Sequence, residues 1–496
     1  MSLHLQENSG HLLRELILPP FRDALKTLTD AYAAFWTPHE QRTLKQRLTL
    51  TSAYTLIQFA TRIFLRIVST VILSRLLEPS VFGVFAVIGM VMMMIGTFTD
   101  IGLRPIALSR EGGLTDDFIQ SSQTVRVIRG FLLVLIMLVV CTVVYVLQLR
   151  EYFLPESAFA DPELPFLMMG ISLTFICTSL GTSNQMLYDR KLDHDLMFKF
   201  SMCFSVVEGT LPFVMVYLTG SIWGLVIASV SIAAVRASMS WLFFKGPPFK
   251  LRFEKEHLLL FLDRGKWLMS QTLLSTVGST ADRVLFGLMF TDAWFGLYYL
   301  ATQISLMFEQ LLRGFENRVG IQLFNNLAEE TPEVFRDKYY RLRLPFDFAA
   351  LTTAGFLATI APALIDLIYE DRYAQVADFI QILAFTSIFT GPCLIRQAFM
   401  SNREFKLTST FTLIRVAFYW ASLGFAIIVL ESVTVAMWMV VMQRLPETLL
   451  LLHFGWKRGW ISYWREIRMA PCLILGAAIG YAAGEAYYWL LSPYFS

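Results

Sequence analysis

The sequence predicts an all-α membrane protein with many transmembrane helices. Of its 496 residues, 55% are hydrophobic and only 16% are charged, whereas about a quarter of a typical soluble protein is charged. The mean hydropathy is +0.55. A transmembrane helix needs about 20 predominantly apolar residues, and runs of this kind recur along almost the whole chain. The composition therefore indicates a polytopic α-helical membrane protein.

Thirteen apolar runs predict thirteen membrane-spanning helices. They cover residues 51–77, 81–102, 125–147, 164–187, 198–219, 222–244, 268–290, 294–316, 344–368, 377–399, 407–430, 433–452 and 470–491. Each run is long enough to cross the hydrocarbon core of a bilayer.

The sequence pattern at one corner between two helices occurs twice in the chain. Residues 74–94 read SRLLEPSVFGVFAVIGMVMMM, and residues 287–307 read GLMFTDAWFGLYYLATQISLM. An offset of 213 residues places Phe82 and Gly83 on Phe295 and Gly296. Two six-helix bundles in the same orientation, related by a pseudo-twofold axis along the membrane normal, explain such a repeat. We therefore expect Gly83 and Gly296 to occupy equivalent corners, with about one extra carboxyl-terminal helix after the second bundle.

The apolar runs and the charged segments between them divide the chain into five parts. We expect a cytoplasmic amphipathic leader at 1–48, a first bundle at 49–244, a basic cytoplasmic linker at 245–267, a second bundle at 268–452, and an interfacial Trp-rich segment with the last helix at 453–496. The leader mixes apolar and basic residues, which is typical of a helix lying on a membrane surface. It lacks the apolar core and cleavage site of a signal peptide.

The distribution of basic residues predicts the orientation. Of 41 Lys and Arg residues, 32 fall in the amino-terminal tail and the inner loops with their flanking helix ends. Three fall in outer loops, and six lie within spans: Arg62, Arg66, Arg236, Arg283, Arg415 and Arg444. Cytoplasmic loops carry an excess of Lys and Arg. We therefore expect a cytoplasmic amino terminus and, with an odd number of helices, an outer carboxyl terminus.

Several chemistries have no sequence support. The five cysteines fall inside predicted spans without paired spacing, and the six histidines lack a metal-binding pattern. No GxxxxGK[ST] loop for nucleotide phosphates is present. We therefore expect no cofactor, no metal, no nucleic-acid partner and no enzymatic activity.

Polar residues follow one face of the first predicted helix and one face of the seventh. The first stripe includes Gln58, Arg62 and Arg66; the second includes Gln271, Ser275, Ser279 and Asp282, followed by Arg283. Spacings of three and four residues place each set on a single helical face. A charge at mid-bilayer is costly and usually functional. The stripes therefore predict substrate contacts in a water-filled cavity, with buried ion pairs to Asp282 or Glu208 as the structural alternative.

The chain resembles the polysaccharide-transport branch of the multidrug/oligosaccharidyl-lipid/polysaccharide (MOP) exporter superfamily. The stretches LSRLLEPSVFGVFAVIGM and FTDIGLRPIALSR fit its L-x-P/D-x-x-F/Y-G turn and the D-x-G helix end, through Leu77, Pro79, Phe82, Gly83, Asp100 and Gly102. The second copy, MFTDAWFGLYYLATQI, resembles the turn between the seventh and eighth helices. The resemblance covers about residues 50–450. It implies a V-shaped pair of bundles around a central cavity lined mainly by helices 1, 2, 7 and 8.

The resemblance also implies a substrate. This is an oligosaccharide linked to a polyprenyl diphosphate, flipped across the cell inner membrane for exopolysaccharide, O-antigen or capsule synthesis, with a polymerase and export machinery as partners. Arginine suits phosphate oxygens, and Gln58, Gln271, Ser275, Ser279, Gln303 and Asn317 supply hydrogen bonds for sugars. Glu208 and Asp282 are candidates for coupling to H⁺ or Na⁺. The alternatives are a multidrug exporter, a peptidoglycan-precursor flippase, and a polysaccharide polymerase or ligase.

Overall fold

The computed structural model describes residues 44–490, except for residues 101, 110–113, 192–193, 253, 255–256, 258, 260, 262–268, 270–271, 328–330, 403 and 468–470. Helices account for nearly all regular structure in this part, and its only strand-like pairing is an isolated bridge between Ser157 and Thr291. The all-α prediction is confirmed. Almost all of the predicted leader, residues 1–43, lies outside the described residues.

The first half contains six long helices and two short ones. They are α3 (Leu44–Leu76), α4 (Pro79–Phe98), α5 (Leu103–Ser109), α6 (Asp116–Leu149), α7 (Leu164–Ser179), α8 (Gln185–Lys191), α9 (His194–Thr219) and α10 (Trp223–Phe243). Pro79 begins α4, where its fixed φ suits the first helical position. The Thr115 side chain caps α6 by accepting a hydrogen bond from the backbone N–H of Phe118.

The second half repeats this plan with more interruptions. Residues 272–279 are helical and bend at Thr280. The elements that follow are α12 (Ala281–Met289), α13 (Asp292–Leu327), α14 (Pro332–Ile368), η2 (Asp371–Tyr373), α15 (Gln375–Leu383), η3 (Ala384–Phe389), α16 (Thr390–Cys393), α17 (Ile395–Ser401), α18 (Phe405–Ile428), α19 (Val433–Met442), α20 (Leu445–Lys457), α21 (Tyr463–Ile467) and α22 (Pro471–Leu490).

Every predicted span contains helix in the described residues, but not always as one piece. The range 377–399 is divided among α15, η3, α16 and α17. Pro392 lies within α16 and removes a backbone donor, which interrupts a regular helix. Ten described helical stretches are long and apolar enough to cross a membrane. The other predicted spans correspond to the shorter α7, to residues 272–289 and to the more polar α13.

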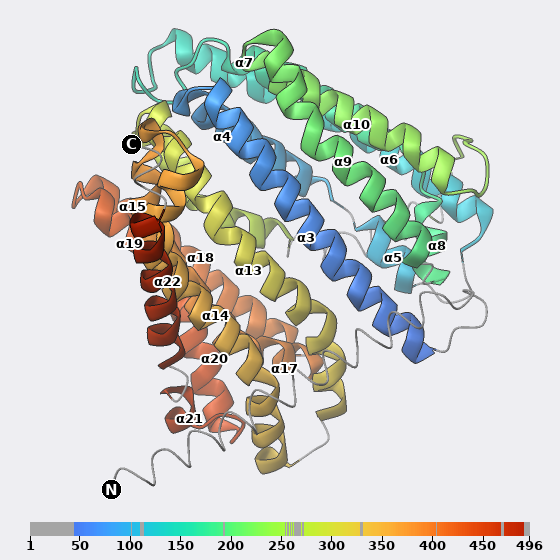
Figure 1. Cartoon of the computed structure of the whole chain (residues 1–496). Coiled ribbons are helices and arrows are strands. Elements are labelled where there is room, and N and C mark those ends of the chain that lie inside the picture. Colours follow the sequence, from blue (N-terminus) through green and yellow to red (C-terminus); the bar gives the residue numbers. More distant parts are fainter. Residues whose placement is uncertain are drawn as a thin grey trace, which may run out of the picture.

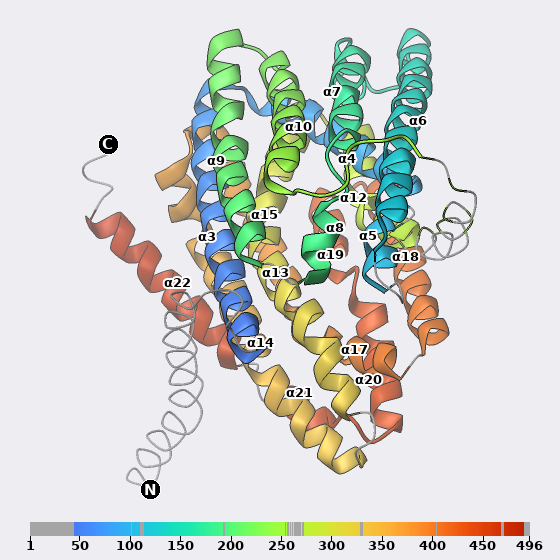
Figure 2. The same cartoon turned by 90° about the vertical axis from the view of Figure 1, so that its right-hand side faces the viewer.

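The helices form two lobes that meet where α4 and α13 begin (Figure 1). We call this the corner end. From there α3 leads away through the first half and α13 through the second half (Figures 1 and 2). The two six-helix bundles expected from the repeat are therefore present.

The two repeated glycines face each other at the corner end. A Cβ atom added to Gly83 would overlap the carbonyl oxygen of Asp292, and one added to Gly296 would overlap the carbonyl oxygen of Pro79. The offset of 213 residues that relates Gly83 to Gly296 also relates Pro79 to Asp292. The environments are thus reciprocal. The doubled corner is therefore a close backbone contact between the two halves of the chain.

One loop from each half crosses to the corner of the other half. The Asp292 N–H donates to the carbonyl oxygen of Glu156 at 2.8 Å. In the opposite direction, the Tyr373 hydroxyl donates to the carbonyl oxygen of Leu77 at 2.8 Å, and Arg372 Nη2 donates to that of Ser74 at 2.9 Å. The last-turn carbonyls of α3 thereby gain partners that the helix itself cannot supply. The corner end is held closed by both loops.

The extra helix α22 packs along α14 in the second half. Added Cβ atoms on Gly476 and Gly480 would overlap the backbone of Thr352 and Phe356, so small residues let the two helices approach closely. The predicted Trp-rich segment contains Trp456, Trp460 and Trp464. Helix α20 ends at Lys457, and the Trp460 ring stacks on Phe335, with centroids 4.8 Å apart.

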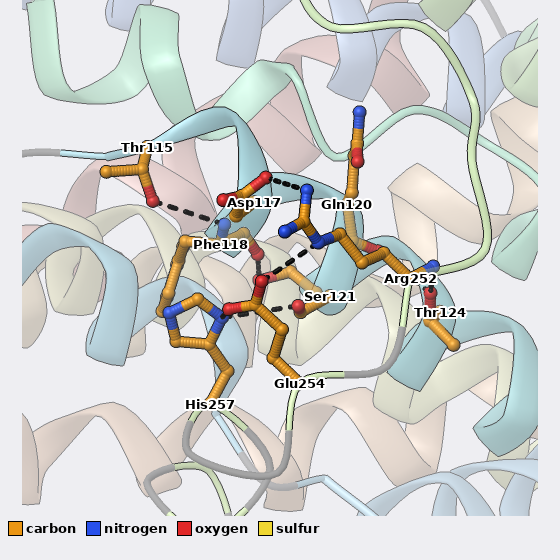
Figure 3. Close-up of polar contacts among 10 residues, drawn as sticks. Thr115, Asp117, Phe118, Gln120, Ser121, Thr124, Arg252, Glu254 and His257 are labelled. Carbon is orange, nitrogen blue, oxygen red and sulfur yellow. Dashed lines mark hydrogen bonds and ion pairs between the residues drawn. The ribbon is translucent and has the colours of Figure 1, made fainter.

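The described part of the linker packs on the first half (Figure 3). Arg252 pairs with Asp117 of α6, and its Nε is 2.8 Å from Glu254 Oε1. His257 Nδ1 lies 3.1 Å from Glu254 Oε2 and 3.2 Å from Ser121 Oγ. Both contacts use the same ring nitrogen, so this serine, histidine and glutamate lack the relay geometry of a hydrolase. The cluster instead anchors the linker to α6.

We expect Gly83→Ala to destabilise the protein. The added methyl group overlaps the Asp292 carbonyl, and overpacking of this kind typically costs about 1–3 kcal/mol. Gly89→Ala is the matched control because it lies on the same helix with open space around it, and alanine favours a helix interior by about 1 kcal/mol. Thermal unfolding of the purified variants in detergent tests this. Equal melting temperatures for both variants would contradict the proposed close contact.

Candidate functional site

A cavity of about 640 Å³ lies mainly within the second half and reaches the first half. Arg66 of α3 and Met93 of α4 line it from the first half. From the second half, it is lined by Ser275, Ser279, Asp282, Arg283, Tyr298, Thr302, Gln303, Ser305, Leu306, Glu309, Gln310, Leu383, Thr386, Thr390, Cys393, Arg396, Gln397, Arg415, Val440, Val441, Gln443 and Arg444. Its size is within the common range for small-molecule sites, and its walls are unusually rich in charge.

The structure gathers five of the predicted site residues around this cavity: Arg66, Ser275, Ser279, Asp282 and Arg283. One residue of the first stripe, Arg66, and three of the second therefore border a common space together with Arg283. Helix α3 and the segment 272–289 supply these residues from opposite halves.

The other predicted residues lie elsewhere. Arg62 and Gln58 belong to α3 but do not line the cavity. Arg62 Nε is 4.0 Å from Glu208 Oε2, and both side chains are about half exposed, at 55% and 46%. Glu208 is the partner that the structural alternative named for Arg62, but the pair is not buried. Gln271 lies outside the described residues.

Arg66 crosses from one half to the other. Its Nη2 atom donates a hydrogen bond to Gln303 Oε1 on α13. In the described part of the chain, no carboxylate lies within ion-pair distance of Arg66. The two arginines of the α3 stripe therefore differ: Arg62 faces an acid of its own half, whereas Arg66 faces a neutral amide of the other half.

Asp282 is bound by a tyrosine and not by the α3 arginines. It is 7% exposed and accepts a hydrogen bond from the Tyr298 hydroxyl. The expected alternative pair between Asp282 and Arg62 or Arg66 is therefore not formed. The neighbouring Arg283 points about 100° away around the helix. Its Nε atom is buried and has no hydrogen-bond partner among the described residues.

Three further arginines were not assigned to the site from the sequence. Arg444 pairs with Glu309, which is 2% exposed. Arg396 Nη2 is 2.8 Å from Glu447 Oε1, and Arg415 Nε is 3.1 Å from Glu447 Oε2; Glu447 is 1% exposed. Arg415 and Arg444 were visible as charges within spans, but their acidic partners come from other helices. Only the fold places each arginine beside its acid.

The arginines of the cavity thus fall into two groups, those beside a carboxylate and those without one among the described residues. Three arginines have a buried carboxylate beside them, and a charge paired in this way is strongly neutralised in a low-dielectric site. Arg66 has a neutral amide, and Arg283 has an unsatisfied nitrogen. These two arginines, with the hydroxyls of Ser275 and Ser279, are the cavity groups suited to an anion.

A family model described as "Polysaccharide biosynthesis protein" matches residues 72–378, more than half of the chain. The chain belongs to this polysaccharide biosynthesis protein family. The match includes the whole of α4, where the repeated corner begins, and the anion-suited residues Ser275, Ser279 and Arg283. No curated protein matches the chain by sequence.

Two solved structures share the fold. The inward closed conformation of the lipid II flippase MurJ superposes with a TM-score of 0.63 at 15% identity, over 90% of this chain and 98% of that chain. An inward-facing MATE multidrug resistance transporter of the MOP superfamily superposes with a TM-score of 0.52 at 13% identity, over 89% and 96%. The resemblance to the MOP superfamily is thereby confirmed, and this multi-pass membrane protein shares the fold of these two transporters.

We expect Glu447→Gln to destabilise the second half. The change leaves Arg396 and Arg415 without their shared carboxylate, and removal of one partner from a buried pair typically costs about 3–5 kcal/mol. Asp337→Asn is the control because it removes an acid from a largely exposed pair with Arg465, and such pairs contribute little. Thermal unfolding in detergent distinguishes them. A Glu447→Gln protein as stable as Asp337→Asn would contradict this role.

Proposed function

We propose that this protein flips a polyprenyl-diphosphate-linked oligosaccharide from the cytoplasmic to the periplasmic leaflet of the cell inner membrane for polysaccharide biosynthesis. The observation that carries the proposal is Arg66, a cavity arginine between the two halves whose described partner is a neutral amide. A diphosphate is a dense anion, and the planar guanidinium binds phosphate oxygens through two parallel hydrogen bonds.

The remaining groups around the cavity have complementary roles in this proposal. Arg283, Ser275 and Ser279 bind the diphosphate together with Arg66. The amides and hydroxyls deeper in the second half, such as Gln397 and Thr390, bind the first sugars. Arg62, Gln58 and Gln271 contact parts of the glycan that extend beyond the cavity. The lipid tail stays in the hydrocarbon region of the bilayer, so it does not have to be transferred into water.

Known relatives support this choice. The family is named for polysaccharide biosynthesis, and a solved structure with the same fold is a lipid II flippase. A peptidoglycan-precursor flippase would use the same diphosphate chemistry, but the family match favours a polysaccharide precursor. A multidrug exporter for cations fits less well, because Glu309 and Glu447 are already occupied by arginines. A polymerase and an export apparatus are the partners that would consume the flipped product.

The proposal assigns sides to the molecule. With the amino terminus in the cytoplasm, α3 ends on the periplasmic side, so the closed corner end faces the periplasm. Transport then requires the two halves to tilt, so that the periplasmic end opens and the cytoplasmic end closes. Asp282 in the second half and Glu208 in the first half are the proposed sites for H⁺ or Na⁺ coupling.

Reporter fusions test this orientation. We expect a reporter at Ser2 to be cytoplasmic and one at Ser496 to be periplasmic, because thirteen spans place the ends on opposite sides. Alkaline phosphatase and a fluorescent protein, active on opposite sides, give the measurement. A cytoplasmic Ser496 would contradict the thirteen-span topology, and a periplasmic Ser2 would reverse the assigned direction.

Transport by Arg66 variants tests the function. In proteoliposomes with a fluorescent polyprenyl-diphosphate-linked oligosaccharide, we expect Arg66→Ala to lower the flipping rate at least 100-fold, because removal of a charge-assisted hydrogen bond pair costs about 3 kcal/mol or more. Arg66→Lys should recover only part of the rate, since a point charge does not reproduce a bidentate fork.

Arg236→Ala is the matched control, because Arg236 also lies within a span but outside the cavity, over the ring of Phe204. It should keep most of the transport activity. Normal flipping by a folded Arg66→Ala protein would disprove the proposed site.

A further inference from the structure

The hydrogen bond between Arg66 and Gln303 joins the two halves inside the cavity. Arg66 belongs to α3 of the first half and Gln303 to α13 of the second. Gln303 follows Gly296 by seven residues, which places it about 10 Å further along α13 at a rise of 1.5 Å per residue. The bond is therefore separate from the glycine contact at the corner end, and both of its partners line the cavity.

Gln303 differs in charge from the partners of the other cavity arginines. Arg444 faces Glu309, while Arg396 and Arg415 share Glu447. A guanidinium binds a carboxylate more strongly than a neutral amide, because only the carboxylate adds the attraction of a full negative charge. An anion that enters the cavity therefore displaces Gln303 from Arg66 more readily than it displaces either glutamate.

We propose that Gln303 is a placeholder for the diphosphate. Its amide oxygen holds Arg66 while the cavity is empty and releases the guanidinium when a diphosphate binds. The exchange breaks a polar contact between the two halves, so occupancy of the cavity frees them to separate. A neutral or weakly acidic ligand does not make this exchange, which gives the site its selectivity for a diphosphate group. This inference rests on the proposed function and adds a residue with a defined role to it.

Binding of farnesyl diphosphate to the purified full-length protein tests the exchange. Gln303→Met keeps the length of the side chain but removes the acceptor, so we expect several-fold tighter binding. Gln303→Glu places a carboxylate on Arg66, so we expect binding at least tenfold weaker. Gln310→Glu is the matched control, because Gln310 lines the same cavity two turns further along α13. It adds the same charge without replacing the partner of Arg66.

The outcomes separate this inference from the proposed function. If wild type does not bind farnesyl diphosphate, or Arg66→Ala binds it as well as wild type, the proposed site fails and this inference fails with it. If Arg66→Ala loses binding but both Gln303 variants match wild type or weaken together, only the placeholder role is overturned. If Gln303→Glu does not fold, Gln303→Met alone decides. Inorganic diphosphate in parallel shows whether the lipid chain is needed for the exchange.

Discussion

The whole architecture depends on how closely α4 and α13 approach each other. Gly83 and Gly296 lack side chains where each helix contacts the backbone of the first turn of the other. Because the corner is repeated, a glycine at the equivalent position of each half allows this close approach. The loops that carry Glu156 and Tyr373 then add hydrogen bonds across the same junction. This junction fixes the positions of α3 and α13, and with them the cavity between the lobes.

The arginines inside the membrane have two kinds of partner in this protein. Among the arginines of the cavity, Arg396, Arg415 and Arg444 are neutralised by buried glutamates. Such pairs are costly to break, so they are poorly suited to exchange partners during transport. At the junction of the halves, Arg66 is held by an amide. The structure thereby separates arginines that maintain the fold from an arginine that remains available to a ligand.

Much of this could be predicted from the sequence, for reasons visible in particular residues. The repeat predicted equivalent corners at Gly83 and Gly296, and the cost of mid-membrane charge singled out Arg62 and Arg66. Helical spacing placed Ser275, Ser279 and Asp282 on one face, and all three line the cavity. Spacing did not separate Arg62 from Arg66, because their difference comes from α9, which brings Glu208 to Arg62. The pairs of Glu309 and Glu447 join distant helices, so no local pattern reveals them.

We propose that the two halves tilt relative to each other when substrate binds, so that the corner end opens and the opposite end closes. Distances between spin labels measure this directly in liposomes, with the native cysteines replaced. One pair, Arg150→Cys with Ala374→Cys, spans the corner end; the other, Lys250→Cys with Glu333→Cys, spans the opposite end. Addition of polyprenyl-diphosphate-linked oligosaccharide should lengthen the first distance and shorten the second. Unchanged distances, or changes of the same sign at both ends, would contradict the account.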